Sequence, residues 1–185
     1  IIEFYGASEG NISLTNVDSK FGSIGRIPPY LKSVLPTKVV KFDVENEVVI
    51  RDENGFCIEC EDGEAGEAIG FIPDDDKFTG KFEGYTDKEA TKKKILENVF
   101  EKGDRWFSSG DLLKKDKQGY YYFVDRIGDT FRWKSENVST NEVSEAISAY
   151  KGIDEVNVYG VEVPNQDGRA GMASLVVNDE FKLEQ

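Results

Sequence analysis

The hydrophobic pattern in the first two-thirds of the chain is that of short β-strands. Residues 39–51 alternate apolar and polar positions on both sides of Glu45-Asn46, which predicts two strands joined by a turn. Asn54-Gly55 is a strong hairpin signal, because both residues tolerate the left-handed backbone of a tight turn. Further strands are predicted at 56–61 and 68–72, with an acidic loop over 61–67 between them. The pattern therefore predicts a compact antiparallel β unit.

A helix and a second hairpin complete this region. Thr86-Asp87-Lys88-Glu89 is a capping box, in which a hydroxyl and a carboxylate each accept a bond from an otherwise unpaired backbone N–H. Strands at 112–115 and 120–124 flank the turn 116–119, which predicts a hairpin. We expect the helix to end at Gly103, with one apolar face made of Ile95, Leu96, Val99 and Phe100.

The pattern changes after Asp129, where a charged loop leads to a second capping box at Ser139-Thr140-Asn141-Glu142. This box predicts a helix that ends at Gly152, and strands are predicted at 156–163 and 170–177. Such an order is typical of a small α+β unit. The predicted fold class is therefore α+β, with a β-rich domain over 1–125, a joint at 126–129 and a small domain over 130–185. The inward-facing residues of the helix are expected to be Val143, Ile147 and Tyr150.

The chain is acidic and has no histidine. Its 185 residues include 36 Asp and Glu against 23 Lys and Arg, for a formal charge of −13. This field repels phosphate backbones, which argues against nucleic acid as a partner, and a polyanionic ligand would need local cations or a metal ion. The absence of histidine excludes Ser-His-Asp and Cys-His catalysis within this chain.

The two cysteines form a single Cys-x-x-Cys, Cys57 and Cys60. A zinc site would need two more ligands, and a strand would point the two side chains to opposite faces. We therefore expect reduced, structural thiols. No apolar run approaches the about 20 residues that span a bilayer. Residues 1–5 resemble a strand interior and 181–185 carry no stop signal, so we expect a piece of a longer protein.

The first segment with candidate chemistry is Phe4-Tyr5-Gly6-Ala7-Ser8-Glu9-Gly10. An aromatic ring can stack on a base, and a glycine allows a ligand to approach the backbone closely. A serine hydroxyl can donate to a phosphate oxygen, and a carboxylate beside it suits Mg²⁺. The structural alternative is a strand that ends in a glycine turn.

The second segment, Arg105–Leu112, places Asp111 directly after a glycine. A carboxylate there can accept both hydroxyls of a ribose, while the structural alternative is an aspartate that caps a turn. In the third segment, 120–140, an aromatic strand stops at Asp125-Arg126, and a turn with Gly128 and Asp129 follows. A fixed cation thus stands beside a glycine hinge, where two units of structure meet.

Together the three segments resemble motifs of the adenylate-forming enzymes, the acyl- and aryl-CoA synthetases and their relatives. The first is similar to their Tyr-Gly-x-Thr-Glu motif, with Ser8 in place of threonine, and the second to their Trp-x-x-Thr-Gly-Asp motif. The third resembles their hinge. Its residues 128–140, Gly-Asp-Thr-Phe-Arg-Trp-Lys-x-Glu-Asn-Val-Ser-Thr, look like the very-long-chain fatty acyl-CoA synthetase branch, also called fatty acid transport proteins.

The resemblance implies a role for each matching residue. Tyr5 would lie against adenine, Ser8 would contact the α-phosphate, and Asp111 would bind the ribose hydroxyls. Two positions depart from the common pattern, since Gly128 stands where many relatives have Asp or Lys and Ser135 where many have Gly. The implied nucleotide residues are Tyr5, Gly6, Ser8, Asp111 and Arg126, with Glu9 as the magnesium ligand, Gly128 and Asp129 as the hinge, and Lys134, Ser135 and Glu136 beside the path of coenzyme A.

The resemblance also implies an activity, the ATP-dependent ligation of a long- or very-long-chain fatty acid to coenzyme A through acyl-AMP, with Mg²⁺. The chain would hold the end of a large adenylation domain and most of the small one, with a phosphate loop before Ile1 and an adenylation lysine after Gln185. Two alternatives stay open: a CoA ligase for a carnitine-like or bile acid, and a non-catalytic nucleotide-binding or interaction module. The expected location is the cytoplasmic side, with peripheral membrane association through parts outside this chain.

Overall fold

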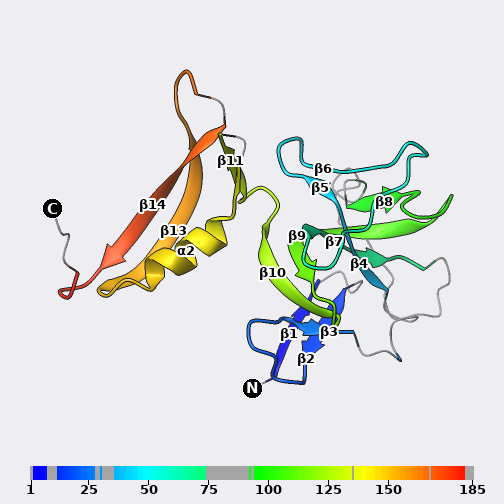
Figure 1. Cartoon of the computed structure of the whole chain (residues 1–185), viewed down its shortest axis with the longest axis horizontal. Coiled ribbons are helices and arrows are strands. Elements are labelled where there is room, and N and C mark those ends of the chain that lie inside the picture. The colour runs from blue at the N-terminus through cyan, green and yellow to red at the C-terminus, as the bar shows by residue number, and fades with distance from the viewer. Residues whose placement is uncertain are drawn as a thin grey trace. The chain divides into compact units, whose positions relative to one another are not determined.

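The computed structural model describes residues 2–7, 12–27, 30, 36–73, 92, 94–134, 136–166 and 168–181. The chain forms two compact units, one of residues 1–43 and 48–123, the other of 44–47 and 124–185. Most strands are antiparallel, and the described residues include one helix, which confirms the predicted α+β class (Figure 1). The domain boundary at 126–129 stays a prediction.

One sheet of eight strands organises the first unit (Figure 1). Its strand order is β1-β2-β3-β10-β9-β7-β4, and β8 pairs with β9. The β9–β10 and β5–β6 hairpins lie where the sequence predicts them. The strands are β1 (Glu3–Gly6), β2 (Ser13–Asn16), β3 (Gly25–Arg26), β4 (Thr37–Val40), β5 (Phe42–Asp43), β6 (Val48–Val49), β7 (Ala65–Phe71), β8 (Ile95–Glu97), β9 (Arg105–Lys115) and β10 (Tyr120–Arg126).

The two faces of this sheet bury separate hydrophobic clusters. Phe107 belongs to one cluster and its neighbour Trp106 to the other, because successive side chains of a strand point in opposite directions. The strand predicted at 56–61 is wrong, because Cys57 and Glu59 form only isolated bridges. Cys60 and Cys57 nevertheless belong to different clusters, as predicted, and both are free thiols. Burial raises the pKa of both thiols, that of Cys60 to about 12, which disfavours the nucleophilic thiolate.

The sequence predicts a helix that ends at Gly103. This prediction is wrong for the described part of the segment, because Ile95–Glu97 form strand β8. Its capping box, 86–89, lies outside the described residues. The carboxylate of Asp104 accepts the backbone N–H groups of Val99, Phe100 and Glu101 at 2.6–3.2 Å. These side-chain bonds to the backbone compete with helical ones and favour a loop instead.

The second unit contains two hairpins and a helix. Strands β11 (Phe131–Trp133) and β12 (Glu136–Val138) pair with each other, so the charged loop predicted after Asp129 is wrong. Helix α2 (Thr140–Ser148) begins as predicted, with the Ser139 hydroxyl accepting the Glu142 N–H at 3.2 Å. Tyr150 was expected to face inward, but it lies beyond the helix and is 49% exposed. Strands β13 (Ile153–Glu162) and β14 (Arg169–Val177) form the second hairpin.

Candidate nucleotide site and hinge

A bulge in β9 positions Asp111. Glu67 pairs with Leu112 and Ile69 with Ser108, so two steps along β7 correspond to four steps along β9. The two extra residues bend β9 within Ser109–Asp111, where Gly110 has a φ of +80°. Glycine reaches this conformation at little cost, which explains its place in the motif. Asp111 therefore lies within a bulged strand.

Asp111 and Tyr5 come together although they are 106 residues apart. The Tyr5 hydroxyl donates a hydrogen bond of 2.6 Å to Oδ2 of Asp111, and both side chains are half-buried. Tyr5 lies on β1, and Gly6 ends that strand opposite Ser13. Ser8 and Glu9 lie outside the described residues, so their phosphate and magnesium roles stay predictions. Within the described ranges, no group of three or more Cys, Asp or Glu is arranged to hold a metal ion.

Sequence reasoning missed the groups that hold this bulge. Glu67 was assigned to the acidic loop 61–67, which is wrong, because it lies in β7 and is only 3% exposed. Its Oε1 accepts the Ser108 hydroxyl at 2.5 Å and the Gly110 N–H at 3.3 Å. Burial raises the pKa of Glu67, although the bonds from Ser108 and Gly110 lower it in part. The sequence contained one sign that Glu67 belongs to a strand, namely its position directly before the apolar residues 68–69.

The predicted hinge, residues 126–129, lies in a turn of the second unit. The turn is present as predicted: the N–H of Asp129 donates to the Arg126 carbonyl at 3.1 Å, and Gly128 has a φ of +95°. Buried Asp125 organises this turn. Its carboxylate accepts bonds from Arg126 N–H, the Thr130 hydroxyl and the N–H of Thr140, each at 2.8–2.9 Å. The nucleotide role of Arg126 and the movement of the hinge stay predictions.

Two of the three residues predicted beside the coenzyme A path are described. Lys134 follows β11 with a φ of +49°, and its ammonium lies 5.3 Å from the centre of the Trp133 ring. Glu136 pairs with Trp133 in the hairpin, and Ser135 lies outside the described residues. A cavity of about 200 Å³ brings Lys134 together with the hinge residue Gly128. The coenzyme A role of these residues stays a prediction.

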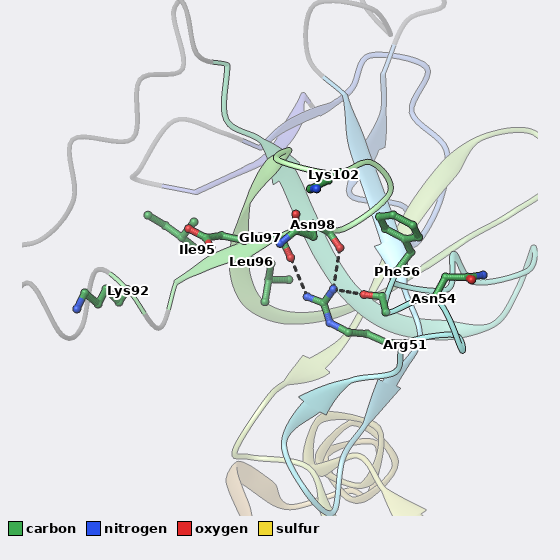
Figure 2. A pocket seen from close by; sticks show the side chains of 10 residues that line it. Arg51, Asn54, Phe56, Lys92, Ile95, Leu96, Glu97, Asn98 and Lys102 are labelled. Atoms are coloured by element: carbon green, nitrogen blue, oxygen red, sulfur yellow. Dashed lines mark hydrogen bonds between the residues drawn. The ribbon is translucent and has the colours of Figure 1, made fainter.

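A wider cavity of about 930 Å³ in the first unit contains neither Tyr5 nor Asp111 (Figure 2). Arg51 points into it, but its guanidinium donates to three backbone carbonyls, those of Gly55, Glu97 and Asn98, at 2.6–3.1 Å. These bonds join the 52–56 turn to the end of β8. Arg51 therefore has a structural role, and the cavity lies apart from the candidate chemistry.

No protein-family profile matches the chain. Curated relatives do: the chain is 47% identical over 173 residues to long-chain fatty acid transport protein 1 of Homo sapiens, a match that covers 94% of the chain and 27% of the relative. It is 45% identical over 183 residues to long-chain fatty acid transport protein 2 of Rattus norvegicus, a match that covers 99% of this chain and 29% of that relative. The chain thus spans less than a third of the length of these relatives.

Solved structures give the same fold. An ATP-bound RpMatB–BxBclM chimera is similar with a TM-score of 0.69 and 26% identity, over 100% of this chain and 32% of the chimera. The O-succinylbenzoate coenzyme A synthetase of Bacillus subtilis, in complex with AMP, is similar with a TM-score of 0.66 and 22% identity. This match covers 98% of the present chain and 32% of the synthetase. This second likeness is one of fold alone.

The antiparallel fold and the three motifs in order define a member of the adenylate-forming superfamily, the acyl-CoA synthetases and their relatives. Within that superfamily, the chain belongs with the long-chain fatty acid transport proteins, which it matches over 94–99% of its own length.

Proposed function

We propose that the full-length protein carrying this chain ligates a long- or very-long-chain fatty acid to coenzyme A, with ATP and Mg²⁺, through an acyl-AMP intermediate. The observation that most supports this proposal is the 2.6 Å hydrogen bond from Tyr5 to Asp111, which joins two motifs from distant parts of the sequence. Both motifs have nucleotide roles in the family resemblance. The fatty acid transport protein relatives support the choice of a fatty acid as substrate.

The nucleotide contacts follow from this pair. A carboxylate that accepts both ribose hydroxyls must have its plane fixed, and the Tyr5 hydroxyl supplies one fixed bond to Oδ2. The Tyr5 ring then lies against adenine, Ser8 contacts the α-phosphate, and Arg126 contacts the ribose and phosphate region. Glu9 is the proposed Mg²⁺ ligand, and the ion would neutralise phosphate charge in a chain that is acidic overall.

The reaction proceeds in two steps. The substrate carboxylate attacks the α-phosphate of ATP, which forms acyl-AMP and releases pyrophosphate. The thiol of coenzyme A then attacks the acyl carbon, forms the thioester and releases AMP. Gly128 and Asp129 are the proposed hinge between the two steps, and Lys134, Ser135 and Glu136 border the coenzyme A path. Since the first step depends on positioning and charge neutralisation, the lack of histidine is no obstacle.

The test is ATP–pyrophosphate exchange by the full-length protein, with a panel of carboxylic acids and a parallel assay of thioester formation. We expect exchange with long or very long fatty acids. Exchange only with a carnitine-like or bile acid would replace the substrate and keep the reaction. ATP binding without exchange for any acid would favour a nucleotide-binding module. A protein that neither binds ATP nor catalyses exchange would overturn the proposal.

The 185-residue chain alone should show no exchange above background, even with fatty acid and Mg²⁺. The family's phosphate loop and adenylation lysine are expected outside residues 1–185, and the proposed first step needs both. Robust exchange by the purified chain would contradict the way the family motifs are mapped onto this sequence.

A further inference from the structure

Glu67 is a buried carboxylate whose bonds converge on one short segment. It is 3% exposed, and the next two residues of β7, Ala68 and Ile69, are fully buried. A carboxylate in such surroundings persists only where hydrogen bonds offset its loss of hydration. Its Oε1 accepts two bonds from the segment directly before Asp111, one from the hydroxyl of Ser108 and one from the N–H of Gly110.

The bulge explains why that segment needs side-chain partners. Extra residues in one strand interrupt the ladder of backbone bonds between β7 and β9. Gly110 N–H therefore donates to Glu67, and the Ser109 carbonyl accepts the Lys94 ammonium at 3.1 Å. Within the bulge, the Asp111 N–H donates to the Ser109 hydroxyl oxygen at 3.0 Å. Side chains replace the ladder here, and they set the backbone from which Asp111 projects.

We propose that Glu67 is a positioning residue for Asp111, and through it for the ribose of the bound nucleotide. This inference rests on the proposed function. Glu67 holds the bulge from β7, Lys94 covers it closely, and Tyr5 fixes the carboxylate that the bulge presents. Gly110 has a φ of +80°, a backbone conformation that other residues adopt only with strain, so the shape of the turn itself requires glycine. Loss of the Glu67 carboxylate would leave the direction of Asp111 poorly defined.

The experiment compares Glu67→Ala and Glu67→Gln in the full-length protein, with Glu59→Gln as the matched control. Glu59 forms ion pairs with Lys38 at 2.8 Å and with Lys115 at 3.7 Å, and neither partner belongs to Ser109–Asp111. In Glu67→Ala the KM for ATP should rise about tenfold, while the KM for the fatty acid stays within about twofold. Glutamine keeps an acceptor oxygen, so Glu67→Gln should stay within about threefold of the wild type for ATP.

A second readout does not depend on catalysis. In the 185-residue chain, the backbone amide NMR signals of Gly110 and Asp111 should shift in Glu67→Ala and stay close to the wild type in Glu67→Gln. If Glu67→Ala does not fold, Ser108→Ala carries the test, since it removes one donor and leaves the Gly110 bond. We expect an ATP KM between those of the wild type and of a protein without Asp111.

An unchanged KM for ATP in a folded Glu67→Ala or Ser108→Ala protein would overturn the inference. An equal rise in both KM values would do the same, because it indicates general loosening of the fold. If the wild-type protein neither binds ATP nor catalyses exchange, the proposed function fails by itself. The Gly110 and Asp111 signals then still decide whether Glu67 holds the bulge.

Discussion

Two buried carboxylates, Glu67 in the first unit and Asp125 in the second, organise the two candidate regions in different ways. Each is 3% exposed. Glu67 bonds to groups 41 and 43 residues away, across the β7–β9 pairing. Among the residues that the structure describes, the hydrogen-bond partners of Asp125 lie 1, 5 and 15 residues away. The nucleotide region therefore depends on sheet register, and the hinge region on a short closed loop.

Because of this difference, we expect the two carboxylates to stabilise parts of the structure that differ in size. Glu67 lies in β7, which pairs with β9 on both sides of the bulge, and it binds the backbone of that bulge. Asp125 bonds both the turn, through Thr130, and the first residue of α2, through Thr140. Loss of Glu67 should therefore alter the ligand site locally, while loss of Asp125 should affect the stability of the whole segment from 125 to 140.

The largest expected effect comes from Asp125→Ala. It leaves the buried Thr140 N–H and neighbouring hydroxyls without their acceptor, which should lower the free energy of unfolding by about 3 kcal/mol. The measurement is urea-induced unfolding of the 185-residue chain, followed by the amide NMR signals of α2. Asp129→Ala is the control, because Asp129 is exposed in the same turn. Equal effects of the two changes would contradict the role of Asp125.

Asp111→Ala should have the second largest effect. It should weaken the binding of ATP and leave the stability of the fold largely unchanged. Hydrogen bonds to a charged group contribute about 1.5–3 kcal/mol each, so the KM for ATP should rise about tenfold or more. The KM for the fatty acid should change less. Tyr5→Phe removes only the bond to Oδ2 and should give a smaller rise. An unchanged ATP dependence in Asp111→Ala would return Asp111 to a structural role.

Two glycines offer a matched test of the hinge. Gly128 and Gly119 have φ values of +95° and +84°, and an added Cβ would contact nothing within 4 Å at either position. Alanine should therefore destabilise the fold by about 1 kcal/mol at both sites, through backbone strain alone. Only Gly128→Ala should change the ratio of acyl-AMP formation to thioester formation, measured in separate half-reaction assays. The same ratio in both variants would count against a hinge at Gly128.

The smallest expected effect is a pH dependence of stability from Glu67. Burial raises its pKa, with Asp111 adding to the rise and Ser108, Gly110 and Lys94 opposing it. The folded state then holds the proton more tightly than the unfolded state, whose glutamate pKa is about 4.3. The wild type should thus be most stable relative to Glu67→Gln below that pH, and should lose this margin as the pH rises through the folded-state pKa. Urea midpoints of the two proteins measure it, and a constant difference would contradict it.

The contrast between local and distant partners also explains what the sequence could predict. The Ser139 cap of α2 and the turn at Gly128 were predicted correctly, because their bonds lie within four residues. Tyr5 and Asp111 could be named from motif resemblance alone. The bond between them, and the role of Glu67, depend on strand pairing over long separations, which no local pattern contains.

The wrong helix prediction around Ile95 and the wrong loop prediction after Asp129 have the same cause. The apolar spacing of Ile95 and Val99 fits a helix, but β9 offers Ile95 a cross-strand partner in Phe107, and Asp104 binds the N–H groups that a helix would use. The β11–β12 hairpin was missed because its charged positions, such as Lys134 and Glu136, are exposed and show no alternation. In both places, pairing with a neighbouring strand determined the local structure.

The bulge in β9 has a consequence for how such a strand can change in evolution. Phe107 and Leu113 lie on either side of it and belong to the same hydrophobic cluster. Because side chains alternate with a period of two, an insertion of two residues keeps both in that cluster, whereas an insertion of one would turn one of them outward. We therefore expect insertions or deletions of even length at this point of β9 to keep Phe107 and Leu113 in the core, and those of odd length to require repacking.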